Sequence, residues 1–375
     1  MEKVTIIQPK IFSKFQCDGS KCNSMCCRDW AIDIDDETYK KYLELKIPNI
    51  EWNEELKSRI FKMKSDGSCP NLDSDHLCKI QKSHGESFLS QTCREFPRQN
   101  KFMGGRFFER ILTLSCPVAA NLILRQNQPI EFDFLLGDRP NFYVDVCIGL
   151  REIEIENVLS LQLAITRILQ NRKFSIDQRL LTLEFFLEKV GDIRWGGGDS
   201  AEDLRENIET LEIFCVSEKF MREDLPRISR KIKFNPEEFL QIMTKLIDSI
   251  RERSTEFRPE IRKYFQRINF NSISLDKFKT LDKFSTIFEN YLVNECWIQL
   301  FPYRFSDLST LQNYFFFVIM YKLQQFAMIH LNAKSKDEII RCIQSFAHIF
   351  THHTTLMDEI SAVAKIDSVS NLLQV

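Results

Sequence analysis

The sequence predicts a mainly α-helical protein that begins with a cysteine-rich module of loops. Eight of its twelve cysteines fall within the first third of the chain, more closely spaced than an apolar core requires. From about residue 117 onward, apolar residues recur every three or four positions, which is the period of a helix with one buried face. We therefore expect residues 1–125 to form the cysteine-rich module and residues 126–375 to form a helical domain.

The composition is that of an ordinary folded chain without a strongly charged surface. The 375 residues are 43% hydrophobic and 28% charged, and the formal net charge is −2. This balance supplies no field to attract nucleic acid or an anionic membrane. The densest apolar run, Tyr314–Tyr321, is shorter than the roughly 18 to 20 residues that cross a bilayer, and Met1–Phe15 lacks the pattern of a signal peptide. We expect a cytoplasmic protein with no nucleic-acid or membrane partner.

The first cysteine group contains Cys17, Cys22, Cys26 and Cys27. In a reducing compartment, clustered cysteines are more often metal ligands or redox centres than disulfides. Cys22 and Cys26 are four positions apart, so a single helical turn would place both on one face. Adjacent Cys26 and Cys27 cannot point the same way in a helix or strand, which leaves one of them for a second site or a different role.

The second group of cysteines is spread over turns and short helices, and consists of Cys69, Cys78, Cys93 and Cys116. Gly67 and Pro70 place the start of this group in turns, which present ligands well. A short helix that Pro97 stops is predicted to carry Cys93. Pro117 favours the first position of a helix directly after Cys116. The sequence therefore predicts eight candidate ligands on local elements of different kinds.

Other elements of the N-terminal third are predicted from caps and spacing. Residues 1–16 are expected to be a polar lead-in, because Pro9 opposes a continuous helix. Aspartate caps and early acidic residues predict a helix from Asp35 to just before Pro48. A further amphipathic helix is expected over Glu54–Lys64.

The rest of the chain is predicted to be helical after one short hairpin. Gly104 and Gly105 suit the turn between two short strands over Lys101–Leu114. Beyond it, the helical windows are Val158–Gln170, Ile176–Val190, Ala201–Arg222, Pro236–Arg253, Phe257–Arg267, Leu275–Leu300, Leu308–Leu331 and Ser335–Phe350. The 32 phenylalanines are expected to fill the core between these helices.

Eight thiolates suit zinc or iron. They could complete two four-cysteine zinc sites, or hold one four-iron cluster through four cysteines and leave four for other duties. Their spacing, C-x4-C-x3-C-C followed by C-x8-C-x14-C, fits neither a standard zinc finger nor the bacterial ferredoxin run. It also lacks the C-x3-C-x2-C arrangement of radical S-adenosylmethionine enzymes. His76 and His84 lie near the second group, but we expect them to be surface residues.

Motifs of the common nucleotide and hydrolase sites are missing from the sequence. It contains no glycine-rich dinucleotide loop, no phosphate-binding loop, no nucleophile elbow and no H-E-x-x-H zinc motif. No Rossmann fold is therefore expected, and no catalytic residue emerges from a motif.

Several segments together resemble bacterial flagellin lysine-N-methylases. They are the run from Pro9 to Tyr42, the segments C-P, L-C-K-I, G-E-S-F-L-S, T-C-R-E-F-P-R and L-S-C-P in and around the second cysteine group, and N-Y-L-V-N-E-C-W-I-Q-L-F-P-Y at Asn290–Tyr303. Those proteins look related to a broader CxxCxxCC group of zinc- or iron-chelating proteins. The first cysteine group departs from that broader pattern, because wider gaps precede the Cys26–Cys27 pair.

The resemblance implies a bacterial enzyme that methylates surface lysines of flagellin before export. It further implies S-adenosylmethionine as the methyl donor and a 4Fe-4S cluster in the N-terminal module, with zinc as the alternative metal. The ligand positions that it implies are Cys17, Cys22, Cys26, Cys27, Cys69, Cys78, Cys93 and Cys116. Without a glycine-rich loop, the donor is expected in the cysteine module or in an unrecognised pocket. The helical domain is expected to dock the protein substrate.

Two other classes of function stay open at this point. The same cysteines could serve a metal-chelating or metal-delivery protein without catalysis, which needs only exposed, exchangeable thiolates. They could also serve a redox or assembly factor whose helical part binds a partner protein. A methylase differs from both, because it needs affinity for the donor and a channel for a lysine near the metal.

Overall fold

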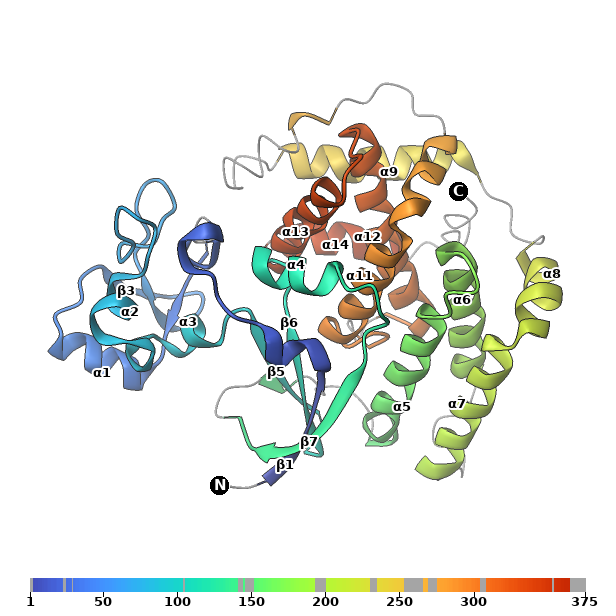
Figure 1. Ribbon diagram of the computed structural model, residues 1–375, viewed down its shortest axis with the longest axis horizontal. Helices are drawn as coiled ribbons and strands as arrows, with labels where there is room; N and C mark the ends of the chain where they lie inside the picture. The colour runs from blue at the N-terminus through green and yellow to red at the C-terminus, as the bar shows by residue number, and fades with distance from the viewer. Residues whose placement is uncertain are drawn as a thin grey trace.

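The computed structural model describes residues 3–22, 25–28, 30–103, 105–140, 144–145, 152–192, 200–229, 235–252, 266–268, 275–303, 308–352 and 354–364. Helices dominate this described part, and its strands all lie within residues 3–145. A small lobe containing α1, α2 and α3 stands to one side of a larger helical body that contains α4 to α14 (Figure 1). The predicted mainly α-helical fold class is confirmed. We call the described residues of 16–96 the cysteine lobe and α4 to α14 the helical body.

The helical body is built from α4 (Pro117–Leu124), α5 (Glu152–Leu169), α6 (Ile176–Asp192), α7 (Ala201–Val216), α8 (Leu225–Ser229), α9 (Pro236–Glu252), α11 (Ser285–Ile298), α12 (Thr310–His330), α13 (Lys336–His352) and α14 (Thr354–Ala364). Most of the predicted helical windows are confirmed. The window that starts at Ala201 is too long, because α7 ends at Val216 and a π-helical turn follows at Phe220–Asp224. The window that starts at Leu275 begins as a 3₁₀-helix, Leu275–Phe284.

One further predicted helix falls largely outside the described residues, and one helix of the structure was not predicted. The window Phe257–Arg267 lies outside the described residues, apart from its last two positions. The apolar spacing did not predict α14, which follows α13 after a single intervening residue. The start of α12, in contrast, has a local cause, because Ser309 and Gln312 form a reciprocal capping box.

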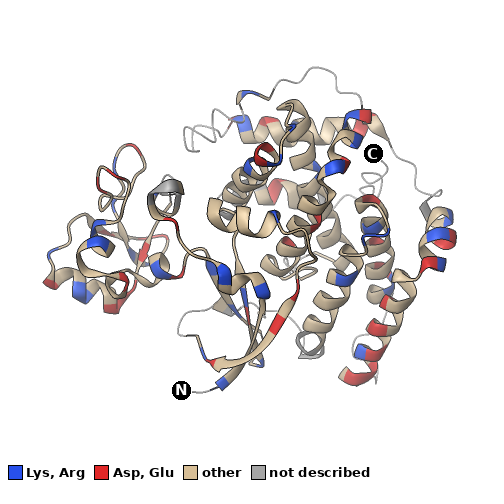
Figure 2. Cartoon of the chain, viewed as in Figure 1, with Lys and Arg blue, Asp and Glu red and all other residues tan. Residues whose placement is uncertain are grey.

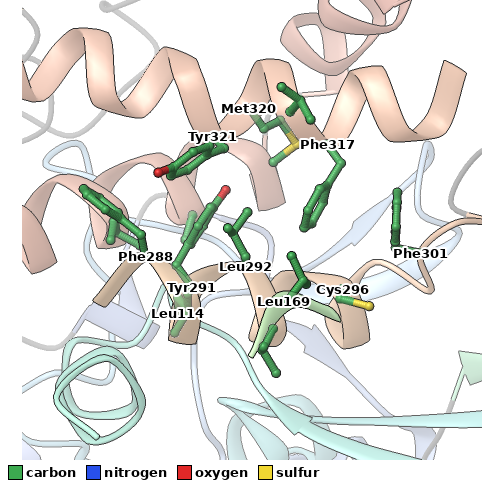
Figure 3. Close-up of a cluster of buried hydrophobic side chains, with 14 of the residues drawn as sticks. Leu114, Leu169, Phe288, Tyr291, Leu292, Cys296, Phe301, Phe317, Met320 and Tyr321 are labelled. Atoms are coloured by element: carbon green, nitrogen blue, oxygen red, sulfur yellow. The ribbon is translucent and has the colours of Figure 1, made fainter. Parts of the chain in front are cut away.

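The core of the helical body lies around α11 and α12, whose side chains meet in Figure 3. Almost every side chain of α12 between Asn313 and Met328 is buried, so this helix is surrounded on all sides. Aromatic rings fill much of the space, and the rings of Phe301 and Phe317 stack with their centroids 4.6 Å apart. The prediction that phenylalanines fill the helical core holds for the described residues of this region.

A five-stranded sheet with the order β7-β1-β6-β5-β8 lies between the lobe and the body. The hairpin of β5 (Arg98–Met103) and β6 (Phe107–Leu112) confirms the predicted strands around the glycine pair. The N-terminal residues are not a polar lead-in, however. They form β1 (Lys3–Pro9), which pairs in parallel with β6 and antiparallel with β7 (Phe132–Asp138).

Residues 1–16 were not predicted to contain a strand because the strands that pair with β1 are distant in sequence. Ile6 and Ile7 are buried, and Pro9 occupies the last position of the strand, where its missing N–H does least harm. The fifth strand, β8 (Val144–Asp145), adds to the far side of β5.

The cysteine lobe has its own small sheet, with the order β2-β4-β3. The predicted helix of the first lobe segment is confirmed as α1 (Asp36–Glu44), and Asp35 caps it by accepting a hydrogen bond of 2.9 Å from the Thr38 N–H. The predicted helix over Glu54–Lys64 is wrong. The chain instead forms a turn and then β4 (Ser58–Phe61), which pairs with β3 (Ile50–Asn53) and β2 (Asp33–Ile34).

Local geometry explains why the helix does not form. The Asn53 side chain accepts a hydrogen bond of 2.8 Å from the Leu56 N–H, and Lys57 has a positive φ of 48°. Both features close a tight hairpin, and a left-handed residue cannot continue an α-helix.

A buried ion pair fixes the sheet against the helical body. Lys101 on β5 faces Glu109 on β6 at 3.1 Å, and both side chains are almost completely buried. The Lys101 ammonium also donates a hydrogen bond to the Trp297 carbonyl oxygen in α11. The strands that follow the cysteine lobe are therefore tied to the centre of the body.

Charge is distributed without a single dominant face. Figure 2 shows acidic and basic residues interspersed over the cysteine lobe and the helical body. This agrees with the small formal net charge of −2.

Candidate metal centre

Five of the eight predicted ligands lie together in the cysteine lobe, on four separate local elements. Cys26 and Cys27 belong to the 3₁₀-helix Met25–Cys27, and Cys69 opens the turn after β4. Cys78 precedes the first residue of α2 (Lys79–His84), and Cys93 lies within α3 (Gln91–Glu95), as predicted.

Backbone hydrogen bonds bring these elements side by side. The N–H of Cys69 donates to the carbonyl oxygen of Cys27 at 2.8 Å, which joins the two cysteine groups directly. Leu72 and Cys78 form an isolated β-bridge that closes the loop of the second group. The indole N–H of Trp30 donates to the Cys26 carbonyl oxygen at 2.9 Å and holds the first loop in place.

The helix that carries Cys93 is held by α1. Asp35 accepts a hydrogen bond of 2.8 Å from the Gln91 N–H, and the Tyr42 hydroxyl accepts one of 3.1 Å from the Ser90 N–H. Ser90 in turn caps α3 by accepting a hydrogen bond from the Cys93 N–H. The first helix of the lobe therefore sets the position of Cys93, although it contains no cysteine itself.

The five sulfurs lie close enough to influence one another. The sulfurs of Cys26 and Cys27 are 3.6 Å apart. The sequence predicted that these adjacent side chains would point in different directions, as they do in an α-helix or a strand. They instead lie in a 3₁₀-helix, and their sulfurs come close together. The pKa of the Cys27 thiol is raised well above its usual value by its hydrogen bond to Cys26, by burial, and by the nearby Cys93 and Cys69. The negative charges of five thiolates would repel one another here.

Burial has the largest effect on the other thiols. It raises the pKa of Cys69 to about 11 and that of Cys93 to about 12, and it also raises the pKa of Cys78. These thiols are therefore neutral at physiological pH unless a cation takes the place of their protons.

Backbone N–H groups nevertheless point at several of the sulfurs. Those of Ile80 and Gln81, in the first turn of α2, lower the pKa of Cys78 against the effect of burial. The Asn71 N–H does the same for Cys69. Such donors stabilise a thiolate, and the sulfur at a helix N-terminus also benefits from the helix dipole.

The remaining three predicted ligands occupy different surroundings. Cys116 immediately precedes α4 and belongs to the core of the helical body. Burial, and to a smaller extent the nearby Cys22 and Cys26, raises its pKa to about 12. The exposed Cys17 accepts a hydrogen bond from the Gly19 N–H, with N and Sγ 3.4 Å apart. Cys22 and Cys26, expected on one helical turn, lie instead in two separate 3₁₀-helices.

The donor set fits a thiophilic metal. Thiolates select zinc and iron–sulfur clusters among the common biological metals, and a bound cation would neutralise the repulsion between the sulfurs. Within the described residues, no group of three Cys, His, Asp or Glu side chains is positioned to bind one metal ion. The sulfurs therefore converge on one region without adopting ligand geometry in this structure.

The histidines and the other cysteines lie apart from this region or outside the description. His76 and His84 are exposed, and the His84 ring packs on Phe88 with centroids 5.4 Å apart. Buried in the helical body are Cys215, Cys296 and Cys342, whereas Cys147 lies outside the described residues.

Two residues of the site were not predicted from the sequence. The burial of Tyr42 has a signal in the spacing of α1, because Thr38 and Tyr42 are four apart and share its buried face. Asn71 has no such signal, because turn residues are usually exposed.

Comparison with known proteins assigns the helical body to a family. Residues 162–375, more than half of the chain, match the FliB lysine N-methylase C-terminal domain. This chain belongs to the FliB lysine N-methylase family. Residues 16–111 match the CxxCxxCC domain, described as zinc- or iron-chelating, and this match includes every predicted ligand except Cys116.

Individual relatives of this FliB family member cover parts of the chain. The flagellar biosynthetic protein FliU of Salmonella muenchen is 33% identical over 159 residues, which are 38% of this chain and 88% of FliU. The lysine-N-methylases of Salmonella typhimurium (strain LT2) and Salmonella choleraesuis (strain SC-B67) are each 35% identical over 141 residues. That alignment spans one third of this chain, 33%, and 33% of each methylase. No solved structure matches the chain.

No helix in the described part of this family member is both long and apolar enough to cross a membrane.

Proposed function

We propose that this FliB family member is a protein-lysine N-methyltransferase that acts on flagellin, with S-adenosylmethionine as the methyl donor. The observation that carries the proposal is the match of residues 162–375 to the lysine N-methylase domain. Two relatives named lysine-N-methylase and one flagellar biosynthetic protein support flagellin as the substrate. Methylation before export would take place in the cytoplasm, which is where we propose that the protein works.

The proposed reaction needs a neutral lysine amine. Its lone pair forms a bond to the donor methyl carbon while the carbon–sulfur bond breaks, and the products are methyl-lysine, S-adenosylhomocysteine and a proton. Because a free lysine has a pKa near 10.4, the site must take up that proton or lower the pKa of the substrate.

We further propose that a 4Fe-4S cluster is held by cysteines of the N-terminal module, with zinc as the alternative metal. The convergence of Cys26, Cys27, Cys69, Cys78 and Cys93 supports this site, and so does the match to a zinc- or iron-chelating domain. Cys17, Cys22 and Cys116 complete the proposed set of ligands. When bound, the metal would cross-link segments of the cysteine lobe. In this proposal residues 1–125 form the metal module, and residues 126–375 dock the substrate.

Metal content tests the cluster directly. The protein is purified without oxygen, and its iron, zinc and acid-labile sulfide are measured together with its visible absorption spectrum. We expect iron and sulfide in a stoichiometric ratio to protein. Stoichiometric zinc without sulfide would remove the cluster and leave the cysteine site in place.

Co-expression with flagellin tests the methylase. Mass spectra of flagellin are expected to show lysine-containing peptides heavier by whole methyl groups. The variant Cys26→Ala, which removes one of the converging sulfurs, is expected to abolish this gain. Cys215→Ala is the matched control, because it removes a thiol from α7 in the helical body and leaves the cysteine lobe intact.

A second candidate function is metal chelation or delivery without catalysis. The match of residues 16–111 to a chelating domain favours it, because that match requires no methylase activity. Bound metal together with an unchanged flagellin mass would support this candidate over the methylase.

A further inference from the structure

Asn71 presents an unpaired amide next to a predicted metal ligand. The residue is 6% exposed, and its Nδ2 has no hydrogen-bond partner in the structure. A buried donor without a partner loses its hydrogen bonds to water and gains none in return, so such groups are rare in folded proteins. A hydrogen-bond acceptor beside this Nδ2 would therefore stabilise the buried amide.

The backbone holds Asn71 between two cysteines. The Leu72 N–H donates to the Cys69 carbonyl oxygen at 3.2 Å, and the Lys79 N–H donates to the Asn71 carbonyl oxygen at 2.8 Å. Lys79 directly follows Cys78. These bonds involve only main-chain atoms, so the turn does not depend on the amide side chain.

The nearby acceptor is the sulfur of Cys69, two residues earlier. The backbone N–H and the side chain of Asn71 both lie beside this sulfur. A neutral thiol is a weak acceptor, but a thiolate is a strong one. A metal-bound thiolate at Cys69 would therefore supply the acceptor that the buried Asn71 Nδ2 lacks.

We propose that the Asn71 amide donates a hydrogen bond to the Cys69 sulfur when that sulfur is a metal-bound thiolate, and so positions this ligand and raises the affinity for metal. This inference rests on the proposed cysteine-bound metal. It adds a positioning residue to the site. It also gives a role to the polar side chain buried in the turn between Cys69 and Cys78.

A cobalt titration tests the role of the amide. Co²⁺ is added to the reduced, metal-free, full-length protein, and the sulfur-to-cobalt absorption band reports both the affinity and the surroundings of the sulfurs. Asn71→Leu and Asn71→Ala remove the donor, whereas Asn71→Ser keeps a hydroxyl donor. Groups that orient metal ligands typically change metal affinity by about 10- to 100-fold when removed. We expect a loss of this size in the first two variants, a shifted band, and partial recovery in Asn71→Ser.

The matched control is Asn53→Ala in the same lobe. The Asn53 side chain accepts the Leu56 N–H at 2.8 Å, so it supports a turn that contains no cysteine. Its cobalt affinity is expected to equal that of the wild type. Circular dichroism of the metal-free proteins shows whether each variant folds, and Asn71→Ser keeps the test valid if Asn71→Leu does not.

Three outcomes would overturn the inference. Wild-type affinity and an unshifted band in Asn71→Leu and Asn71→Ala would remove the role of the amide and leave the metal site standing. An equal loss in Asn53→Ala would assign the effect to general destabilisation of the lobe. If the wild-type protein shows no sulfur-to-cobalt band, the proposed metal site fails, and this inference fails with it.

Discussion

The cysteine lobe and the helical body are stabilised by different means. The apolar core of the body extends from α4 to α14 and includes the almost fully buried helix α12. The core of the lobe is far smaller, and its buried members are Ile32, Ile34, Tyr42, Phe61, Cys69, Leu72, Ile80 and Leu89.

Cysteine side chains form a large part of the packed interior of the lobe. Cys69 belongs to its core, and Cys27, Cys78 and Cys93 pack against it. In a module of roughly 70–80 residues or fewer, a single apolar core rarely supplies more than about 3–5 kcal/mol, and natural modules of about this size commonly add a metal or disulfides. The comparison teaches that the body can hold its fold through apolar burial, whereas the small core of the lobe leaves a structural role for the proposed metal.

Removing the proposed metal should produce the largest difference between the two regions. Structural zinc contributes about 10–16 kcal/mol to small zinc-finger peptides, which exceeds what the core of the lobe can supply. We expect amide hydrogen exchange in residues 30–96 to become fast after chelation, while α11 and α12 keep their protection. Mass spectrometry of peptic fragments measures both regions in one experiment. Equal loss of protection in the lobe and the body would contradict the comparison.

Breaking the buried ion pair of the central sheet should have the next largest effect. Lys101→Met leaves Glu109 buried without its partner, and such a change typically costs about 3–5 kcal/mol. Urea unfolding followed through the helical signal measures this loss of stability. The double variant Lys101→Met, Glu109→Leu should recover most of it, because no buried charge remains.

An exposed ion pair just beyond the ends of β1 and β7 provides the control. The Lys10 ammonium and the Glu131 carboxylate are 2.6 Å apart, and both side chains are largely exposed. Solvent screens this pair, so Lys10→Met should leave the urea midpoint nearly unchanged. A loss as large as that of Lys101→Met would show that burial is not the deciding factor.

The smallest expected effect depends on pH and concerns the helical body alone. Burial, and then the charge of Glu188, raises the pKa of Glu184 in α6 from 4.5 to about 7. The folded protein therefore keeps a proton that the unfolded chain has lost between these two pH values, so stability falls as pH rises through this window.

The variant Glu184→Gln should remove that dependence. We expect it to be more stable than the wild type by about 1–3 kcal/mol at pH 8, and close to the wild type below pH 4.5, the unshifted pKa. Urea unfolding at several pH values measures the difference. The same pH dependence in the variant and in the wild type would show that Glu184 is not its source, and Glu209→Gln on the exposed face of α7 is the control.

Local signals predicted the elements that local interactions determine. The Asp35 cap predicted α1, Pro117 predicted the start of α4, and the glycine pair before Arg106 predicted the hairpin of β5 and β6. Helical spacing likewise located most helices of the body. Their partners in space were not needed for these predictions.

Features that depend on distant partners were not predictable in this way. β1 is a strand because residues near 107 and 135 pair with it, and no local pattern of residues 1–16 reveals those partners. The hairpin that replaces the expected helix over Glu54–Lys64 depends on the left-handed conformation of Lys57. At the candidate site, sequence density identified the cysteines, but the contact between Cys27 and Cys69 needed the fold.

The position of β1 in the sheet also bears on the order of folding during synthesis. β1 lies between β6 and β7, so its first residues leave the ribosome well before Phe132–Asp138 can pair with them. Such a non-local pairing forms late, because the intervening chain must first be brought together. The cysteine lobe is made in that interval, so the proposed metal ligands are available before the N-terminal strand is in place.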